Sequence, residues 1–545
     1  MKAIFTHKLL IAIILLAALL RFYKLSALPA LNADEAAIGY NAYSLIQTGK
    51  DEHGNSWPIH FQSFNDFKPG LYFYLVIPFV AILGLSEIAV RFPSALLGVA
   101  TVLLVWLLVR ELFPKNKWLP YVSALFLAVS PWNLHYSRGG WEANAATFFI
   151  TLGVLGFVKG MTSSRWRLVW PIAFVASLYT YHAARVFIPL IFISLLLIYR
   201  ESIFNNLKKY FAPVMLSFFL TVPLLLDLTG SAGMSRAAGV GLFADTGPFW
   251  RINEQRGEHE QLDSKIARVL HNKATNYSLA FLQNYTEHFW GEFLFLSGDE
   301  IQRNKVPETG QMYVHDLFFV VVGLILIARR PKGWGVLLLW LAISPLAAAL
   351  TFQSPHALRA QIMTIPLVII SAYGALSILD TAKGSIKNKT LLFIIYFLLF
   401  TIATWSTARY LHEYYFHMAK TFDYSSQYGV KELVSYTINN QEKYPKIVVT
   451  DRYDQPYILF LFYLKYPPIV FQTDHTLTER DQFGFSTVRK FDKYEFRSID
   501  PWSQTRQEYP GALIVGIEKE IPDGTNVLNT IYFPSGRTAF KMVGN

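Results

Sequence analysis

"LLIAIILLAALLRFYKLSALPALNADEAAIGYNAYSL", residues 9–45, predicts a membrane span followed directly by a polar surface helix. The apolar run at its start has about the length that a helical span needs, roughly 20 residues. Behind this run, Asn32 or Asp34 begins an amphipathic helix that we expect to reach about Ile46. Two adjacent carboxylates, Asp34 and Glu35, therefore stand where the chain leaves the membrane.

The composition of the whole chain agrees with many spans joined to a sizeable soluble part. Of 545 residues, 53% are hydrophobic and 16% aromatic, while only 16% are charged. The net charge of +11 does not indicate a nucleic-acid partner, because many basic residues lie in short loops between apolar runs. The chain has no cysteine, which excludes disulfides, thiolate metal sites and cysteine nucleophiles.

Apolar runs along the chain predict a polytopic α-helical membrane protein with about eleven transmembrane helices. The predicted spans are 9–27, 88–109, 119–134, 143–160, 168–182, 186–199, 211–226, 315–328, 334–351, 362–379 and 390–408. One more run, "GLYFYLVIPFVAILGL" at 70–85, is ambiguous. If it crossed the membrane, every later loop would change sides.

Basic clusters decide the topology, because cytoplasmic loops are enriched in lysine and arginine. Six basic groups share one side only if 70–85 does not cross, so we predict an interfacial or re-entrant helix there. The N-terminus is then cytoplasmic and the C-terminus outward. The six groups are Lys2/Lys8, Arg110/Lys115/Lys117, Lys159/Arg165/Arg167, Arg200/Lys208/Lys209, Arg329/Arg330/Lys332 and Lys383/Lys387/Lys389.

The first run could instead be a signal peptide, with "SALPA" as its cleavage site. Arg21 and Lys24 interrupt the run before that site, which favours an uncleaved span. The expected location is the plasma or inner membrane.

Two domains follow from this topology. We predict a transmembrane domain at 1–408, with outward loops at 28–87 and 227–314, and a soluble outward-facing α/β domain at 409–545. In the tail, "KIVVT" (446–450) and "GALIVGI" (511–517) predict strands, and "PYILFLFYLKY" (456–466) predicts a helix or a buried strand.

The carboxylates Asp34 and Glu35 have two readings. As early residues of a helix they would cap its start and complement its dipole. Alternatively, a carboxylate at an apolar interface has a raised proton affinity and can act as a general base. Adjacent residues on a helix point in different directions, so the two side chains would have different roles.

Further charges lie in outward segments where topology does not require them. Lys68, in "NDFKPGLY", either extends to lipid headgroups or binds a phosphate at membrane level. Arg138 and Glu142 lie in the outward turn "HYSRGGWEAN". The other misplaced cations are Arg91, Arg185 and Arg359. Each alone fits headgroup contact, but together they suit an anionic substrate embedded in the membrane.

The sequence shows no metal motif. There is no HExxH and no close histidine pair on one helical face, so structural or hydrogen-bonding roles are expected for His182 and His356. "GVGLFA" (239–244) formally matches a dinucleotide fingerprint, but it lacks a preceding strand and is discounted. There is no P-loop and no GxSxG.

These motifs resemble the GT-C class of lipid-carrier-dependent glycosyltransferases, in particular the glycosyltransferase family 39 and aminoarabinose-transferase-like group. The resemblance covers most of 1–410. It rests on "DE" after the first span, "KPG-LY" before the interfacial helix, "RFPSALLG" at the second span and "SRGGWE" in the second outward turn. It implies a GT-C fold and an active site on the extracytoplasmic face.

The resemblance also implies roles for individual residues. Asp34 would deprotonate the acceptor hydroxyl and Glu35 would help to orient the acceptor. Lys68 would contact the carrier phosphate, and Glu142 would take the acidic position of the second loop. We add Arg138 and Arg359 as phosphate or acceptor contacts.

The sequence departs from the family pattern at two places. Gly70 stands where a second proline is usual, which predicts a looser start of the following helix. Residues 36–38, "AAI", lack the charged and aromatic residues that some relatives carry there, which leaves the substrate open.

The expected partners are a polyprenyl-phosphate sugar donor, an acceptor protein, lipid or glycan, and membrane lipid. Phosphate is a good leaving group, so a base and cations suffice, with inversion at the anomeric carbon expected from the family. No cofactor is required. Related oligosaccharyltransferases hold a divalent metal with carboxylates of these loops, but too few well-spaced ligands are present here to predict one.

Two other classes of protein stay open. A multi-pass transporter or flippase of a lipid-linked glycan should show inverted repeats and charges deep within paired spans, whereas the charges here lie at span ends. A membrane-anchored sensor or assembly protein would leave the outward charges unexplained.

Overall fold

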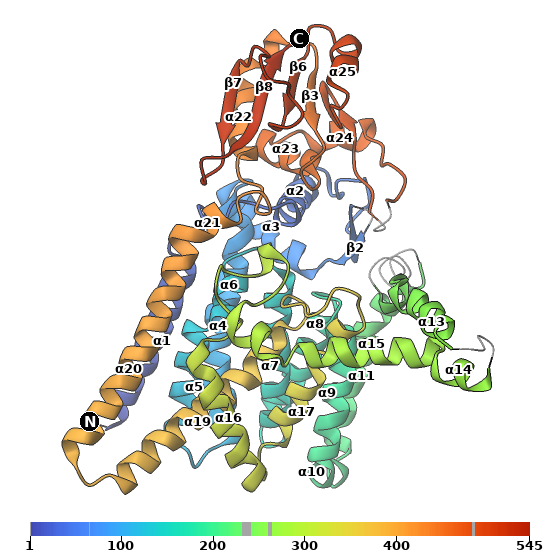
Figure 1. Ribbon diagram of the computed structural model, residues 1–545. Helices are drawn as coiled ribbons and strands as arrows, with labels where there is room; N and C mark the ends of the chain where they lie inside the picture. The colour runs from blue at the N-terminus through green and yellow to red at the C-terminus, as the bar shows by residue number, and fades with distance from the viewer. Residues whose placement is uncertain (1, 65, 231–240, 260–263, 482–484) are drawn as a thin grey trace. The chain divides into compact units, whose positions relative to one another are not determined.

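The computed structural model describes residues 2–64, 66–230, 241–259, 264–481 and 485–545, and the side chains from residue 7 onward. The chain folds into two compact units, neither of which is continuous in sequence (Figure 1). The first unit comprises 1–21, 96–137 and 142–410. The second unit comprises 22–95, 138–141 and 411–545.

The first unit is helical. Its longer helices are α1 (Lys2–Phe22), α4 (Glu87–Leu112, shared with the second unit), α5 (Leu119–Val129), α6 (Pro131–Ser137), α7 (Glu142–Gly160), α8 (Val169–Leu178), α9 (Ala184–Ile198), α10 (Arg200–Phe204), α11 (Lys208–Leu228), α16 (Val314–Arg329), α17 (Gly335–Ile343), α18 (Leu346–Ala349), α19 (Thr364–Ser385) and α20 (Lys389–His412). Short 3-10 turns lie at Ser164–Leu168, Leu242–Ala244, Gln302–Asn304 and Gln361–Met363.

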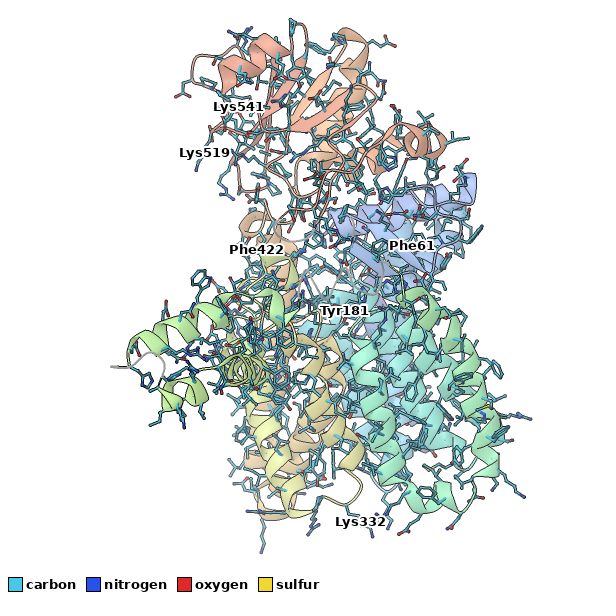
Figure 2. All side chains as sticks on the ribbon, turned by 90° about the vertical axis from the view of Figure 1, so that its right-hand side faces the viewer. Phe61, Tyr181, Lys332, Phe422, Lys519 and Lys541 are labelled. Atoms are coloured by element: carbon cyan, nitrogen blue, oxygen red, sulfur yellow. The ribbon has the colours of Figure 1, made fainter. Side chains whose placement is uncertain are left out.

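The apolar helices pack side by side, α7 on α8 and α19 on both α5 and α16. Their closest approaches need glycine: a Cβ on Gly374 of α19 would lie 1.9 Å from the carbonyl oxygen of Phe319 of α16. Figure 2 shows Lys332, from a predicted cytoplasmic cluster, and Tyr181 at opposite ends of this bundle. That separation agrees with the predicted topology, which stays a prediction.

Each of the eleven predicted spans overlaps a helix of the described chain. Among the described residues, five helical segments are long and apolar enough to cross a membrane by themselves: Glu87–Leu112, Glu142–Gly160, Lys208–Leu228, Gln361–Ser385 and Lys389–Thr421. The run at 70–85 forms α3 (Leu71–Leu83), a helix of 13 residues that is shorter than a span requires. The count of eleven spans therefore stays a prediction, and the helical membrane fold is clear.

The predicted outward loop 227–314 contains helices of its own. They are α13 (Gly247–Gly257), α14 (Lys265–Leu270), α15 (Lys273–Glu287) and a π-helical turn at Glu292–Leu296. Of the discounted "GVGLFA" match, residues 239 and 240 lie outside the described residues, and Leu242–Ala244 form a 3-10 turn. The loop is thus an ordered part of the first unit where the structure describes it.

The second unit begins with the first outward loop. This loop holds α2 (Ala33–Thr48), a hairpin of β1 (His60–Ser63) and β2 (Asp66–Pro69), and α3. The tail adds a π turn at Glu413–His417, α21 (Met418–Thr421), α22 (Val430–Asn440), a 3-10 turn at Gln441–Lys443, α23 (Pro456–Leu464), α24 (Pro468–Asp474) and α25 (Trp502–Glu508).

The tail contains a six-stranded mixed sheet in the order β4-β5-β3-β6-β8-β7, as predicted for an α/β domain. Its strands are β3 (Ile447–Thr450), β4 (Lys490–Phe491), β5 (Tyr494–Arg497), β6 (Leu513–Gly516), β7 (Asn529–Tyr532) and β8 (Thr538–Gly544). The central β3 runs parallel to β5 and β6 and is buried throughout, as are the residues of β6. Residues 456–466 form α23, so of the two predictions the helix is correct.

The tail and the first outward loop share one core. Helix α2 packs on α23, and a Cβ on Gly39 would lie 2.6 Å from Cε2 of Phe462. The Tyr40 hydroxyl donates to the carbonyl of Tyr466, and the amide of Gln427 accepts from the backbone of Ala33. The helix start that carries Asp34 is therefore supported by the tail.

Candidate active site

The two carboxylates in the first turn of α2, Asp34 and Glu35, lie in different surroundings. Asn32 is the N-cap: its side chain accepts from the Glu35 backbone at 3.0 Å, and Glu35 reaches back to the Asn32 backbone, which completes a capping box. The capping interpretation is thus correct for Glu35. Asp34, one residue earlier, points elsewhere.

Glu35 is buried in a network of hydrogen bonds. It is 1% exposed, and its two oxygens accept from Nε and Nη2 of Arg91 at 2.7 Å each. Its Oε1 also accepts from the Gly140 backbone at 2.8 Å. A carboxylate enclosed in this way is suited to fixing the surrounding chain, and its predicted contact with an acceptor is not supported by its burial.

Arg91, one of the cations that the topology does not require, has a structural role. Besides Glu35, its guanidinium donates to the carbonyls of Leu25, Pro29 and Ala30 at 2.9 to 3.1 Å. The segment between the first apolar helix and α2 is therefore tied to the start of α4. Neither this pairing nor the role of Gly140 follows from sequence spacing, because 56 and 105 residues separate the partners.

The Gly-Gly pair of the second outward turn has a packing reason. A Cβ on Gly140 would lie 2.9 Å from Val90 and 3.4 Å from Cγ of Glu35. Glycine lets the backbone approach Glu35 closely enough to donate to it.

Asp34 and Lys68 form an ion pair across 34 residues. Lys68 lies on β2 opposite Phe61 of β1, and its ammonium is 5.4 Å from the Phe64 ring. The side chains of Asp34 and Lys68 are 24% and 11% exposed, so the pair is partly shielded but reachable. The structure thus brings together a carboxylate and a cation that sequence analysis singled out separately.

The predicted looseness after Lys68 is wrong. The Gly70 backbone donates to the Ile59 carbonyl at 2.9 Å, and a Cβ there would lie 2.8 Å from that oxygen. Proline could not make this hydrogen bond because it has no N–H. Gly70 therefore fixes the hairpin to the start of α3.

A buried acid beside Lys68 was missed by sequence analysis. Glu52 is fully buried, and burial raises its pKa to about 8, while hydrogen bonding to Asn41 and the charge of Lys68 act in the opposite direction. Its neighbour His53 contacts His475 of the tail, Nδ1 to Nε2, at 2.8 Å, and burial lowers the pKa of His53 to about 3. The "DEHG" sequence at 51–54 carries no periodicity that reveals this burial.

Arg138 and Glu142 are placed differently. Arg138 is 2% exposed, donates to the Tyr23 carbonyl at 2.8 Å and stacks with the rings of Tyr414 and Tyr415. These contacts stabilise the buried guanidinium of Arg138 without a phosphate. Glu142 begins α7 in the first unit and is 8% exposed. Their predicted ligand contacts stay predictions.

Arg359 lies on an ordered turn of the first unit. Its guanidinium donates to the Thr351 hydroxyl at 2.6 Å. Asp299 accepts from the Ala357 backbone at 2.6 Å and from the Asn304 amide at 3.0 Å, and burial raises the pKa of this acid. These bonds fix the turn from the side of the 227–314 loop.

Histidines support the same region, as expected for hydrogen-bonding roles. His288 accepts from the His356 backbone at 3.1 Å, and its other ring nitrogen contacts the Asn284 carbonyl at 2.7 Å. Burial, followed by the charge of Arg359, lowers the pKa of His288 to about 4. His182 pairs with Arg185 at 3.0 Å.

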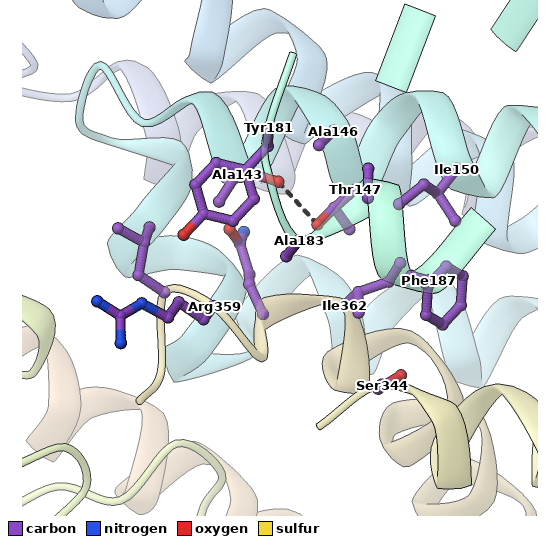
Figure 3. A pocket seen from close by; sticks show the side chains of 13 residues that line it. Ala143, Ala146, Thr147, Ile150, Tyr181, Ala183, Phe187, Ser344, Arg359 and Ile362 are labelled. Atoms are coloured by element: carbon purple, nitrogen blue, oxygen red, sulfur yellow. Dashed lines mark hydrogen bonds between the residues drawn. The ribbon is translucent and has the colours of Figure 1, made fainter. Parts of the chain in front are cut away.

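Arg359 also borders a mainly apolar pocket of the first unit. The pocket is small, with a cavity volume of about 20 Å³. Figure 3 shows Arg359 at one edge near Tyr181, with Ile150 and Phe187 at the opposite end. Its lining is Ala143, Ala146, Thr147, Ile150, Tyr181, Ala183, Ala184, Phe187, Ser344, Leu358, Arg359, Gln361 and Ile362.

Within the described residues, no group of three or more histidine, aspartate or glutamate side chains is arranged to hold a metal ion. The candidate chemistry of the second unit therefore consists of Asp34 and Lys68, with Glu35 and Arg91 fixing their support.

Comparisons with known proteins agree with this fold. The sequence model of the dolichyl-phosphate-mannose-protein mannosyltransferase family matches residues 68–226. No curated protein matches the chain in sequence. The solved structures of ArnT from Cupriavidus metallidurans, in the apo state and bound to undecaprenyl phosphate, are each 11% identical and have TM-scores of 0.55 and 0.53. The apo comparison covers 99% of this chain and 98% of ArnT.

A longer archaeal protein shares the fold as well. AglB, an oligosaccharyltransferase from Archaeoglobus fulgidus solved with an inhibitory peptide and a dolichol-phosphate, is 14% identical with a TM-score of 0.51. The comparison covers 85% of this chain and 64% of AglB. These comparisons do not favour the transporter alternative. Over residues 68–226 the chain is thus similar in sequence to a family of lipid-linked mannosyltransferases, and as a whole it has the fold seen in ArnT.

Proposed function

We propose that the protein transfers a sugar from a polyprenyl-phosphate donor to an acceptor hydroxyl on the extracytoplasmic side of the membrane. The observation that carries this proposal is the contact between Asp34 and Lys68, in which a carboxylate at the start of α2 and a cation of β2 lie side by side. ArnT, whose fold the chain shares, has been solved with undecaprenyl phosphate bound. That ligand supports the class of donor.

The reaction needs one general base and one cation that stabilises the leaving phosphate. Asp34 accepts the proton of the acceptor hydroxyl, and the acceptor oxygen forms a bond to the anomeric carbon. The bond between that carbon and the phosphate oxygen breaks, and the phosphate leaves with the electron pair. Lys68 stabilises the charge on the leaving phosphate, and attack opposite to the leaving group inverts the anomeric centre.

The ion pair between Asp34 and Lys68 also suggests an order in which donor binding precedes activation of the acceptor. Without a donor, Lys68 neutralises Asp34 and weakens it as a base. A donor phosphate competes for the ammonium through charge-assisted hydrogen bonds. Donor binding therefore releases the carboxylate for the acceptor, so the base becomes effective when there is a sugar to transfer.

We also propose Arg359 as a contact for a lipid phosphate, argued within the first unit alone. It borders a small pocket whose walls are apolar along Ile150 and Phe187, while Arg359 and Tyr181 supply polar groups at one edge.

Sugar transfer from a panel of polyprenyl-phosphate sugars, measured in proteoliposomes, tests the proposal. Asp34→Asn should reduce transfer by about 100-fold or more, in the upper part of the range typical of a lost general base. The variant should still bind the donor, because the amide keeps the shape of the side chain.

The matched control is Asp523→Asn, which changes an exposed acid of the tail and should transfer normally. Equal transfer by Asp34→Asn and wild type would contradict the role of Asp34 as a base. Absence of transfer from every donor by wild-type protein would contradict the proposed class of donor.

A further inference from the structure

The first unit carries an exposed apolar arm, formed by residues 241–259 and 264–270. It includes α13 and α14, which extend from one end of α15 (Figure 1). Large apolar side chains project from it: Phe243, Trp250, Ile266, Val269 and Leu270 are 79%, 62%, 66%, 70% and 53% exposed. Soluble surfaces seldom gather so many large apolar groups without a partner.

Hydrogen bonds to a predicted membrane span set the depth of this arm. Its Leu242 backbone donates to the Leu350 carbonyl at 2.8 Å, at the outward end of the span 334–351. Helix α15 continues along the same span, where the Tyr285 hydroxyl donates to Ala342 at 2.9 Å. Ala342 lies in α17 and Leu350 directly follows α18, so α15 lies beside the predicted outer end of the span.

The arm is fixed to α15 and cannot leave that depth freely. The Tyr277 hydroxyl of α15 donates to the Asp245 carbonyl at 3.0 Å, and the rings of Phe243 and Tyr277 are 5.0 Å apart. Arg256 donates from Nε to the His271 carbonyl at 2.8 Å. The exposed apolar side chains are therefore held at the level of the predicted outward end of the span 334–351.

Charge complements this position. Exposed cations accompany the apolar groups, namely Arg251 on α13, Lys265 and Arg268 on α14, and Lys273 at the start of α15, whose ammonium is 5.5 Å from the Phe249 ring. They outnumber the exposed acids of the arm, Glu254 and Glu258. A helix with aromatic and aliphatic groups on one side and basic residues beside them is typical of segments that lie in the headgroup region. Basic residues near the surface favour anionic lipid.

We propose that this arm docks on the outer leaflet of the surrounding membrane, with its apolar side chains among the acyl chains and its cations at anionic phospholipid phosphates. Docking would hold the 227–314 loop, and with it the turn that carries Arg359, against the bilayer surface. The inference concerns a lipid surface and does not depend on the reaction proposed above.

The absence of cysteine makes the test direct, because a single introduced cysteine accepts a nitroxide label at one site. Full-length Val269→Cys is reconstituted in phosphatidylcholine bilayers with and without phosphatidylglycerol. Electron paramagnetic resonance then compares relaxation by oxygen, which concentrates in lipid, with relaxation by a water-soluble nickel chelate. We expect the label at 269 to respond to oxygen more than to nickel, and more strongly so when phosphatidylglycerol is present.

Two exposed apolar residues provide references. Phe397→Cys lies on the predicted lipid-facing surface of α20, where Phe397 is 57% exposed, and Ile438→Cys lies in the tail, where Ile438 is 40% exposed. The label at 269 should resemble the former, and Leu270→Cys should repeat the result. A label as open to nickel as the one at 438 would overturn the proposal. Protection that requires an added acceptor peptide or lipid donor would assign the surface to that partner and would overturn it equally.

Discussion

Arg91 and Glu35 form a buried ion pair on which the stability of the second unit should depend. Both side chains are at most 1% exposed, and they bond to each other, to backbone groups and, for Glu35, to the Asn32 amide. Arg91→Met would leave the carboxylate of Glu35 buried without its cation, which should cost about 3–5 kcal/mol of stability. Thermal and denaturant unfolding of the purified protein measures this loss.

The exposed pair Arg409–Glu308 is the control for that experiment. Its side chains are 47% and 73% exposed, so Arg409→Met should change stability by no more than about 1 kcal/mol. The double variant Glu35→Gln with Arg91→Met should lose less than the sum of the single variants. Simple additivity would contradict the coupling of the two residues.

Lys68 should matter for the donor and not for the fold. Lys68→Met removes an ammonium that is proposed to bind phosphate, and a hydrogen bond to a charged group is worth about 1.5–3 kcal/mol, or roughly 10- to 100-fold in affinity. The measurement is the Kd of the polyprenyl-phosphate donor. Lys50→Met, at an exposed lysine of the same loop, should bind normally. Equal affinities for both variants would rule out a phosphate contact of Lys68.

Glu52 should give the protein a pH-dependent stability. Its pKa of about 8 in the folded state lies above its ordinary value of 4.5, so the folded chain holds a proton that the unfolded chain releases between these values. Stability should therefore fall as the pH rises through this window. Between pH 6.5 and 8, His53 is neutral in both states, because its pKa is lowered from 6.5 to about 3.

Glu52→Gln should flatten the dependence of thermal stability on pH between 6.5 and 8 and should raise stability at the upper end. The exposed Glu258→Gln serves as the comparison and should keep the wild-type slope. A slope that survives in Glu52→Gln would mean that another group titrates there.

At the scale of elements, the turn that carries Arg359 depends on Asp299. Asp299→Ala leaves the buried Ala357 N–H and the Asn304 amide without this acceptor, at about 1–3 kcal/mol for each group. Hydrogen exchange measured by mass spectrometry should become faster across 353–361. Asp299→Asn keeps one acceptor oxygen and should restore part of the protection. Unchanged exchange in Asp299→Ala would show that the turn is fixed by other contacts.

Elements with a strong local pattern could be predicted from sequence. Apolar runs located the membrane helices, and the polar residues before an amphipathic run predicted a helix that starts at Asn32 or Asp34; the N-cap is Asn32. The buried strands β3 and β6 were recognisable as short runs of aliphatic residues. Strands β4, β5, β7 and β8 were not predicted. Strands β4, β5 and β7 have only two to four residues each, and β8 does not alternate regularly between buried and half-buried residues. Helices α13 to α15 lie in a loop of mixed polarity that has no single period.

At the scale of the whole molecule, the first outward loop and the tail fold as one unit. Gln472 of α24 donates to Ser44, Thr48 and Asp51 of the loop, and Ser486 donates from its backbone to Phe64. A chain that ends at Tyr410 should therefore lose transfer activity, and its residues 33–69 should become sensitive to protease. Limited proteolysis followed by mass spectrometry measures this change.

The expected sensitivity separates two explanations of lost activity. If the tail only bound the acceptor, its removal would leave the first loop protected. Retained protection of 33–69 in the shortened chain would contradict a shared core.

Parts of the site that join distant segments could not be predicted from one sequence. The choice of Asp34, Glu35 and Lys68 came from their place beside a membrane helix and from a family resemblance. Their pairing depends on a hairpin register that sets Lys68 opposite Phe61. The anchoring of Glu35 depends on Arg91 and Gly140, which come from other segments. Such contacts leave no periodic signal in the chain.

The capping box at Asn32 has a consequence for how the enzyme could diversify. Adjacent Cα atoms are 3.8 Å apart, so the hydrogen bonds that fix Glu35 also restrict the position of the Asp34 backbone beside it. The position of Asp34, the proposed base, is thereby independent of the composition of the surrounding loops. If Asp34 is the base, those loops can be exchanged and its position is kept.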